Sequence, residues 1–179
     1  MAKVAIVLGE DFEDSEFDTP RSALVDAGHD VVVVGVEKGA EVVGKRGEVR
    51  QRVDAEVDEI DLRDIDALVI PGGYSPDHLR TDEGIVRFVK DIVEWGTTVA
   101  AICDAGSLLI EADVVAGRTL TSWPSIRTDL VNAGAAWMDS EVVLDGNLIT
   151  SRNPDDLPAF TNAVLGALRS GSQHGKGAA

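Results

Sequence analysis

"TDEGIVRFVKDIVEWGTTVAAICDAGSLLIEAD", residues 81–113, contains the helix, strand and turn from which the fold can be inferred. Its first part carries apolar residues at helical spacing: Ile85, Phe88, Val89, Ile92 and Val93. Thr81 is the expected N-cap of this helix, and Gly96 is its expected end. A nearly continuous apolar run follows over 97–103, which is typical of a buried parallel strand. This order predicts a parallel sheet covered by helices.

The same kinds of pattern recur along the chain. Three more apolar runs predict buried parallel strands: 3–8, 30–36 and 66–73. Helical patterns are expected at 18–28, 124–134 and 155–169. The Asp145-Gly146 pair between two strand-like runs predicts a hairpin over 141–151. The alternation predicts an α/β fold in which helices cover both faces of a largely parallel sheet.

Composition predicts one domain with an acidic surface. The chain has 179 residues, enough to bury a core, and we expect a single domain over 1–169 and a disordered tail over 170–179. With 32 acidic and 16 basic residues, the net charge is -16. Such a charge repels nucleic acid and anionic lipid surfaces, so neither is an expected partner. The acidic residues are scattered, which indicates a surface adapted to concentrated salt and a halophilic source.

The N-terminal sequence and the cysteine count predict a cytoplasmic protein without disulfides. The apolar stretch from Val4 to Leu8 is only five residues long, too short for a signal peptide's apolar region or a membrane span. The single cysteine, Cys103, cannot form an internal disulfide. A lone cysteine is a candidate nucleophile only if its surroundings support that role.

Three strand ends carry residues that could take part in chemistry. In a doubly wound sheet, sites form at the carboxyl ends of the strands, here 9–13, 72–77 and 103–106. Cys103 ends a strand and precedes a helix start, so the turn would expose its side chain and the helix dipole would favour a thiolate. The alternative, a buried structural thiol, fits the local pattern about equally well.

The other two strand ends give weaker signals. The glycines of Pro71-Gly72-Gly73 would let backbone N–H groups approach a bound group, although this tripeptide is more often a plain turn. Glu13 lies in the acidic loop "GEDFEDSEF", which could equally be a solvated run of charges. Neither signal identifies a site by itself.

Together, four segments resemble the PfpI branch of the ThiJ/PfpI superfamily, the intracellular cysteine peptidases and protein deglycases. They are "GEDFEDSEF", "ALVIPGGYSPDHLR", "VAAIC" and "GRTLTSWPSIRTDLVNAGAAWMDSEVVLDGNLITSRNPDDLPAF". The similarity covers 3–169, almost the whole chain. It implies a flavodoxin-like three-layer sandwich with a mostly parallel sheet and a reactive cysteine at a nucleophile elbow.

By this resemblance, Cys103 is the elbow cysteine and Glu13 is the glutamate that hydrogen-bonds it. A protonated carboxyl beside a thiol can donate to the thiolate and lower the pKa of the thiol. The backbone N–H groups of Gly73 and Asp104 would form an oxyanion site, worth roughly 3 to 4 kcal/mol each. The resemblance also implies a homo-oligomer, a dimer or a hexamer, associating through 71–79 and the elbow.

One feature departs from the family pattern. PfpI-type peptidases carry a histidine directly after the cysteine, oriented by an acid from a neighbouring subunit, whereas this chain has Asp104 and Asp77 at those positions. A base that titrates near neutrality contributes roughly 100- to 10,000-fold to proton transfer, but an ordinary exposed aspartate titrates near about 4. A histidine-assisted peptidase is therefore disfavoured. The two aspartates could instead meet across a subunit interface as a carboxylate pair.

Two further residues are candidate accessories. His78 could replace the missing imidazole, although a histidine in a polar loop is more often simply solvated. Trp123 could form a wall of the pocket or pack in the core. The local sequence does not decide between these alternatives.

The expected function is a cysteine-dependent enzyme of the deglycase or glyoxalase type. In it, Cys103 attacks a small aldehyde such as methylglyoxal, or the early adducts of such an aldehyde on protein, and no cofactor or metal is expected. One alternative is a redox or stress-response protein in which Cys103 is oxidised to a sulfinic acid. The other is an intracellular cysteine peptidase, which Asp104 disfavours.

Overall fold

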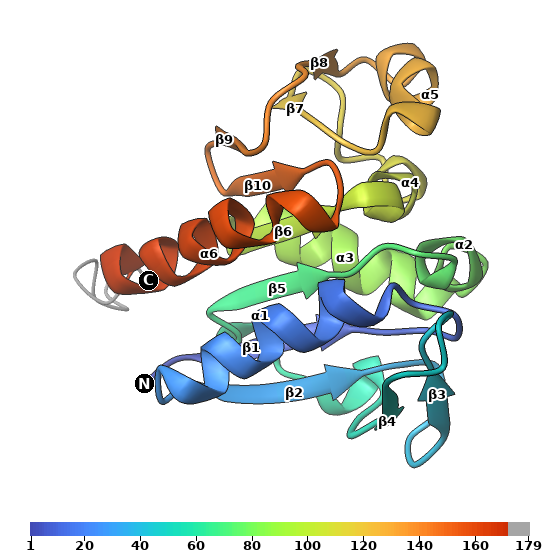
Figure 1. Ribbon diagram of the computed structural model, residues 1–179, viewed down its shortest axis with the longest axis vertical. Helices are drawn as coiled ribbons and strands as arrows, with labels where there is room; N and C mark the ends of the chain where they lie inside the picture. The colour runs from blue at the N-terminus through green and yellow to red at the C-terminus, as the bar shows by residue number, and fades with distance from the viewer. Residues whose placement is uncertain (172–179) are drawn as a thin grey trace.

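The computed structural model describes residues 1–171, in which strands and helices alternate (Figure 1). The strands are β1 (Lys3–Val7), β2 (Asp30–Val34), β3 (Glu41–Val43), β4 (Arg50–Arg52), β5 (Ala67–Ile70), β6 (Thr98–Ile102), β7 (Thr119–Leu120), β8 (Ala136–Trp137), β9 (Val143–Asp145) and β10 (Leu148–Ser151). The helices are α1 (Asp14–Asp26), α2 (Ser75–Leu79), α3 (Glu83–Trp95), α4 (Gly106–Glu111), α5 (Arg127–Asn132) and α6 (Leu157–Gly171).

The central sheet has six strands in the order β2-β1-β5-β6-β10-β9. Its first five strands are parallel, and β9 runs antiparallel at the edge. Numbered among themselves, the parallel strands have the order 2-1-3-4-5, which is the flavodoxin-like arrangement. The predicted fold class is therefore confirmed.

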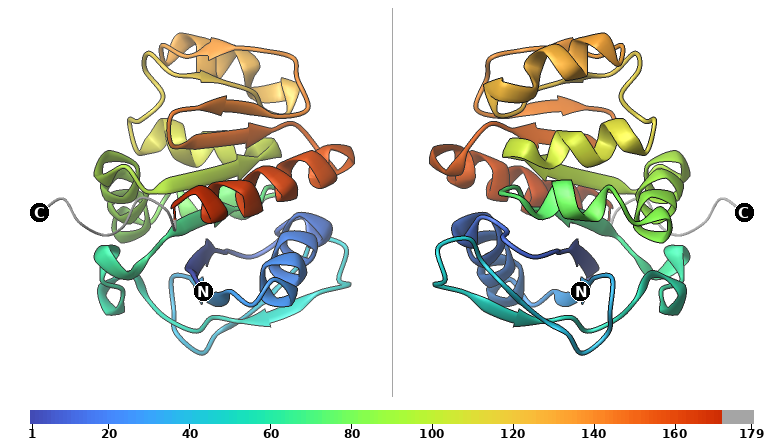
Figure 2. Two further views of the ribbon diagram at one scale, coloured as in Figure 1. Left: turned by 90° about the vertical axis from the view of Figure 1, so that its left-hand side faces the viewer. Right: turned by 90° about the vertical axis from the view of Figure 1, so that its right-hand side faces the viewer.

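Helices lie in two layers, one on each face of the sheet (Figure 1, Figure 2). Side chains of successive residues in the strands point alternately to these two layers. One row packs with α3 and α4: Ala5, Leu68, Val99 and Leu148. The next row packs with α1 and α6: Ile6, Val69, Ala100 and Ile149. The sheet is thus buried on both faces, which explains why its strands are continuously apolar in sequence.

The loops that follow β1 and β5 are joined at the carboxyl edge of the sheet. Phe12 and Gly73 form an isolated antiparallel bridge between these loops. Beside the bridge, the N–H of Glu13 donates to the carbonyl of Gly72 at 3.1 Å, and the N–H of Tyr74 donates to the carbonyl of Asp11 at 2.8 Å. These bonds hold the first two predicted site loops against each other next to the end of β6.

Several element ends differ from those predicted. The N-cap of α3 is Asp82, whose carboxylate accepts the N–H of Ile85 at 2.9 Å, while the Thr81 hydroxyl donates to the carbonyl of His78. The predicted end of α3 at Gly96 is confirmed by its left-handed φ of 91°. Helix α1 begins at Asp14, four residues before the predicted range 18–28, and an acid in the first turn favours this start.

The hairpin over 141–151 is confirmed as β9 and β10, in which Leu148 pairs with Asp145. Two small sheets, β3-β4 and β7-β8, have no apolar run to predict them. Helix α6 continues to Gly171, so the predicted tail begins too early, and the rest of that tail, 172–179, lies outside the described residues. Within 1–171, no helix is long and apolar enough to cross a membrane.

Candidate active site

Cys103 lies at a strained turn between β6 and α4. Residues 103–105 form a single 3-10 turn after the strand, and Cys103 itself has a φ of 61°, in the left-handed region that few residues other than glycine adopt. Its carbonyl accepts the N–H of Trp123 at 3.2 Å, and its side chain is half-buried. The predicted strand-to-helix elbow is confirmed, and the thiol belongs to the sheet edge at which the other two site loops meet.

A buried carboxyl, Glu16, lies next to this thiol. Glu16 has no exposed surface, and its Oε1 accepts the N–H of Gly72 at 2.9 Å. A methyl group at Gly72 would lie 2.6 Å from Glu16 Oε1 and 2.7 Å from Cys103 Cβ, so the carboxyl and the cysteine both adjoin the Cα of that glycine. Burial raises the pKa of Glu16 to about 8, which leaves this carboxyl protonated at neutral pH.

Glu13, the residue expected beside the thiol, points elsewhere. Its Oε2 binds Lys45 Nζ at 2.7 Å, and its Oε1 accepts from Arg46 Nε at 2.9 Å. The expected placement of Glu13 is therefore corrected: the carboxyl that flanks the cysteine is Glu16, one helical turn later. The sequence feature that could have identified Glu16 is its helical spacing. Glu16 lies four residues before Pro20 and eight before Leu24, which are both on the buried face of α1.

The backbone N–H groups of Gly73 and Asp104 both hydrogen-bond the sulfur of Cys103. Burial raises the pKa of the Cys103 thiol, and the carboxylate charges of Glu16 and Asp104 raise it further. Hydrogen bonds from the N–H groups of Asp104 and Gly73 act in the opposite direction, because they favour the thiolate. Protonation of Glu16 removes one of the opposing charges. The two N–H groups are consequently placed to stabilise negative charge that develops near the sulfur.

Asp104 is not the ordinary exposed aspartate assumed from the sequence. It is half-buried, and Cys103 Sγ donates to its Oδ2 at 3.7 Å. Its other oxygen, Oδ1, accepts from the hydroxyl of Ser125 at 3.5 Å. Burial raises the pKa of Asp104, while these hydrogen bonds and the positive charge of Lys45 oppose that rise. Its carboxyl is therefore in direct contact with the candidate nucleophile.

Lys45 brings a positive charge to the site that the sequence analysis missed. Its ammonium binds Glu13 and lies 6.0 Å from the centre of the Tyr74 ring. The charge of Lys45 acts on Cys103, Glu16 and Asp104, in each case favouring the ionised acid. No signal in the polar stretch around Lys45 would have identified it.

The loop that carries Lys45 is held by one buried carboxylate at the start of α1. Asp14 is 1% exposed and accepts the N–H groups of Arg46, Glu48 and Val49 at 2.9, 3.0 and 2.9 Å. Burial alone would raise the pKa of Asp14, but the backbone N–H groups outweigh it and the pKa is lowered. The β3-β4 hairpin is thereby fixed to the helix that also carries Glu16.

The candidate accessory residues lie at the surface of the site. Asp77 is exposed on α2, and His78 is exposed with its Nε2 3.8 Å from Asp11 Oδ2, facing that carboxylate. Trp123 is 43% exposed, so the core-packing alternative for it is wrong. Tyr74, which directly follows Gly73, is 64% exposed. Trp123 is joined to the cysteine through its backbone N–H, which donates to the Cys103 carbonyl.

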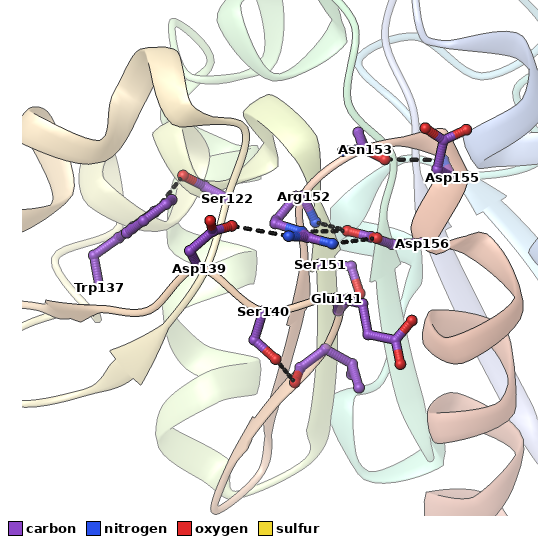
Figure 3. Close-up of polar contacts among 11 residues, drawn as sticks. Ser122, Trp137, Asp139, Ser140, Glu141, Ser151, Arg152, Asn153, Asp155 and Asp156 are labelled. Carbon is purple, nitrogen blue, oxygen red and sulfur yellow. Dashed lines mark hydrogen bonds and ion pairs between the residues drawn. The ribbon is translucent and has the colours of Figure 1, made fainter.

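The neighbouring edge of the sheet is fixed by an arginine between two carboxylates (Figure 3). Arg152 directly follows β10, the parallel neighbour of β6. Its Nε and Nη2 donate to Asp156 at 3.0 and 2.9 Å, and its Nη1 donates to Asp139 at 2.8 Å. Two residues before Asp139, Trp137 at the end of β8 donates its indole N–H to Ser122 at 3.0 Å. The arginine thus links the end of β10 to the turn before α6 and to the segment that follows β8.

Comparison with known proteins shows what the chain is similar to. A model of the DJ-1/PfpI family matches residues 2–167. Protein/nucleic acid deglycase 2 of Escherichia coli (strain K12) is 46% identical over 164 residues, 91% of this chain and 95% of that protein. General stress protein 18 of Bacillus subtilis (strain 168) is 47% identical over 167 residues, 93% of this chain and 97% of that protein. A crystal structure of a two-domain protein with DJ-1/ThiJ/PfpI-like and ferritin-like domains, from Anabaena variabilis, has a TM-score of 0.92 and 43% identity, covering 94% of this chain and 48% of that one.

Proposed function

This chain belongs to the DJ-1/PfpI family, and from that premise we propose that it is an enzyme of the deglycase or glyoxalase type. Cys103 attacks the carbonyl carbon of a small aldehyde such as methylglyoxal, or of its early adducts on protein. The observation on which the proposal depends is the group of residues around the Cys103 thiol. A half-buried cysteine at a strained elbow faces a protonated carboxyl, Glu16, and two convergent N–H groups.

Addition forms a bond between Cys103 Sγ and the aldehyde carbon and breaks the π bond of the carbonyl. The thiol proton ends on the former carbonyl oxygen, which gives a hemithioacetal. With methylglyoxal, the C1 proton then moves to C2 through an enediol, and the neutral Glu16 donates a hydrogen bond to the substrate oxygen. The resulting thioester is cleaved by water, which releases lactate and restores the thiol. The N–H groups of Gly73 and Asp104 stabilise the oxygen while it carries negative charge.

The names of relatives support the substrate class. The E. coli relative is named a protein/nucleic acid deglycase, which favours sugar- or aldehyde-modified macromolecules as substrates in addition to the free aldehyde. The net charge of -16 favours modified protein over modified nucleic acid, because phosphates would be repelled. The proposal therefore ranks free methylglyoxal and glycated peptide above glycated nucleotides.

The test is turnover of methylglyoxal, glycated peptide and unmodified peptide in high salt, with Cys103→Ala as control. We expect lactate release from methylglyoxal and amine release from glycated peptide, with neither in the variant. Wild-type protein that cleaves only the unmodified peptide would show a peptidase instead. That outcome is disfavoured because Asp104 replaces the histidine expected in such peptidases.

A second candidate is a redox or stress-response protein, favoured by the 47% identity to General stress protein 18. Cys103 would react with two molecules of hydrogen peroxide, each of which transfers one oxygen and leaves as water, to give a sulfinic acid. Glu16 Oε2 is buried and without a hydrogen-bond partner among residues 1–171, so its hydroxyl is free to donate to that group. Mass spectrometry after mild peroxide treatment discriminates: stable gain of two oxygens without aldehyde turnover favours this candidate.

Assembly into a dimer or a hexamer is the corresponding proposal for quaternary structure. Tyr74 and Trp123 place two large exposed aromatic side chains beside the elbow, on the face that the resemblance assigns to subunit contact. Sedimentation in high salt should give the mass of two or six copies. A monomer at all protein concentrations would contradict this proposal without affecting the chemistry of Cys103.

A further inference from the structure

We propose that the Asp104 carboxylate is the base that accepts the proton of Cys103, and that Ser125 positions it. This inference rests on the proposed function and deepens it: the side chain that stands in place of the family's histidine takes over the histidine's proton transfer. The cysteine would then work between two carboxyls with different tasks. Asp104 would accept a proton, and Glu16 would donate a hydrogen bond.

Each carboxylate oxygen of Asp104 accepts a different hydrogen bond. Cys103 Sγ donates to Oδ2 at 3.7 Å, and Ser125 Oγ donates to Oδ1 at 3.5 Å. Adjacent residues rarely face each other in a strand, because successive side chains alternate between faces. The contact exists here because Cys103 has a φ of 61° and begins a 3-10 turn, which brings the next side chain back toward the sulfur. The turn thus pairs the thiol with its own neighbour.

The charges around Asp104 favour its role as the acceptor. The groups that act on it are Cys103, Ser125 and Lys45, and it acts in turn on Glu16. The Lys45 ammonium favours the ionised form of Asp104. Glu16, with a pKa of about 8, is neutral at pH 7 and can donate. Burial raises the pKa of Asp104 as well, but the hydrogen bonds from Cys103 and Ser125 and the charge of Lys45 oppose that rise. An acid and a base in one site are commonly distinguished by such differences in their surroundings.

The step balances within the site. As the bond between Sγ and the aldehyde carbon forms, the thiol proton passes to Asp104 Oδ2 and the carbonyl π electrons move to oxygen. Asp104 then returns that proton to the oxygen, which completes the hemithioacetal and restores the carboxylate. No oxidant, reductant or further reactant is needed.

The variant Asp104→Asn tests whether Asp104 carries a proton during turnover or only affects the thiol through its charge. The carboxylate charge raises the pKa of the thiol, so its removal lowers that pKa and should speed alkylation of Cys103 by iodoacetamide at pH 7. If Asp104 carries the proton, the same variant loses about 100-fold in methylglyoxal turnover. Alkylation and turnover therefore move in opposite directions. Ser125→Ala should lower turnover by a few-fold with unchanged alkylation, since it only loosens the carboxylate.

The matched control is Asp129→Asn, which removes an exposed carboxylate on α5 and should change neither rate. Circular dichroism and urea unfolding show whether each variant is folded. Turnover and alkylation that rise together, fall together or both stay unchanged in Asp104→Asn would overturn the inference while leaving the function intact. If Cys103→Ala turned over methylglyoxal at the wild-type rate, that result would instead overturn the proposed function, and the inference with it.

Discussion

Glu16 and Cys103 both lie within 3 Å of the position that a Cβ at residue 72 would occupy, so the buried carboxyl and the cysteine leave room there only for glycine. Backbone conformation does not require glycine at position 72, because the left-handed φ is found at Gly73 and not at Gly72. What requires glycine at 72 is space, because a Cβ would lie under 3 Å from both neighbours. This contact brings the helix that carries Glu16 close to the turn that carries Cys103.

Gly72→Ala should therefore separate the two groups. We expect a loss of about 1–3 kcal/mol in the free energy of unfolding, typical of overpacking, and a large drop in Cys103-dependent turnover. Gly166→Ala in α6 is the control, because its Cβ would have nothing nearer than 3.7 Å. That variant should be neutral or more stable by up to about 1 kcal/mol. Wild-type turnover in Gly72→Ala would contradict the close approach.

Glu16 should make stability depend on pH in a defined window. Its pKa is about 8 in the folded protein and near 4.5 when unfolded, so the folded state holds the proton longer. The stabilisation is complete below about pH 4.5 and is lost as pH rises toward 8, with a slope of up to about 1.4 kcal/mol per unit. Urea unfolding between pH 5 and 8 should show this decline in wild type and not in Glu16→Gln. Glu83→Gln, which removes an exposed carboxyl, should retain it; an equal slope in Glu16→Gln would refute the assignment.

Asp14 should control the loop that carries Lys45. Asp14→Ala leaves three backbone N–H groups without their acceptor, which should cost about 3 kcal/mol. The freed hairpin should also be cut faster by trypsin after Lys45 and Arg46. Asp18→Ala, on the exposed face of the same helix, should show neither effect. If the two variants are cut at equal rates, Asp14 does not anchor the hairpin.

The acidic surface predicts stabilisation by salt. At a net charge of -16, repulsion among carboxylates opposes the compact state, and salt shortens its range from about 10 Å at 0.1 M to about 3 Å at 1 M. The free energy of unfolding should therefore rise as KCl increases over this range, measured by urea unfolding. A flat or falling dependence would argue against a halophilic source.

The strands and the elbow could be predicted because they depend on local apolar periodicity, whereas the flavodoxin-like arrangement of the sheet followed from the resemblance to the family. The residues 97–103 read as a buried strand and end at Cys103, and the chain order of strands and helices suffices for a doubly wound sheet. The N–H groups of Gly73 and Asp104 were expected from the resemblance alone, and both hydrogen-bond the Cys103 sulfur, because the two loops follow neighbouring parallel strands.

The side chains around the thiol were harder to predict. Glu13, Asp14 and Glu16 are close in one acidic loop, and only the true start of α1 decides which of them points inward. A predicted start at residue 18 left Glu16 outside the helix, so its position on the buried face was invisible. The burial of Asp104 and the arrival of Lys45 depend on contacts between distant segments. No local pattern records those contacts.

The central claim is that Cys103 performs aldehyde chemistry, and lactate release from methylglyoxal tests it most directly. The assay compares wild-type protein with Cys103→Ala at equal concentration in high salt. Circular dichroism checks that both proteins are folded. We predict sustained lactate release by the wild type and none above the buffer rate by Cys103→Ala. Equal lactate release by the two proteins would contradict the account.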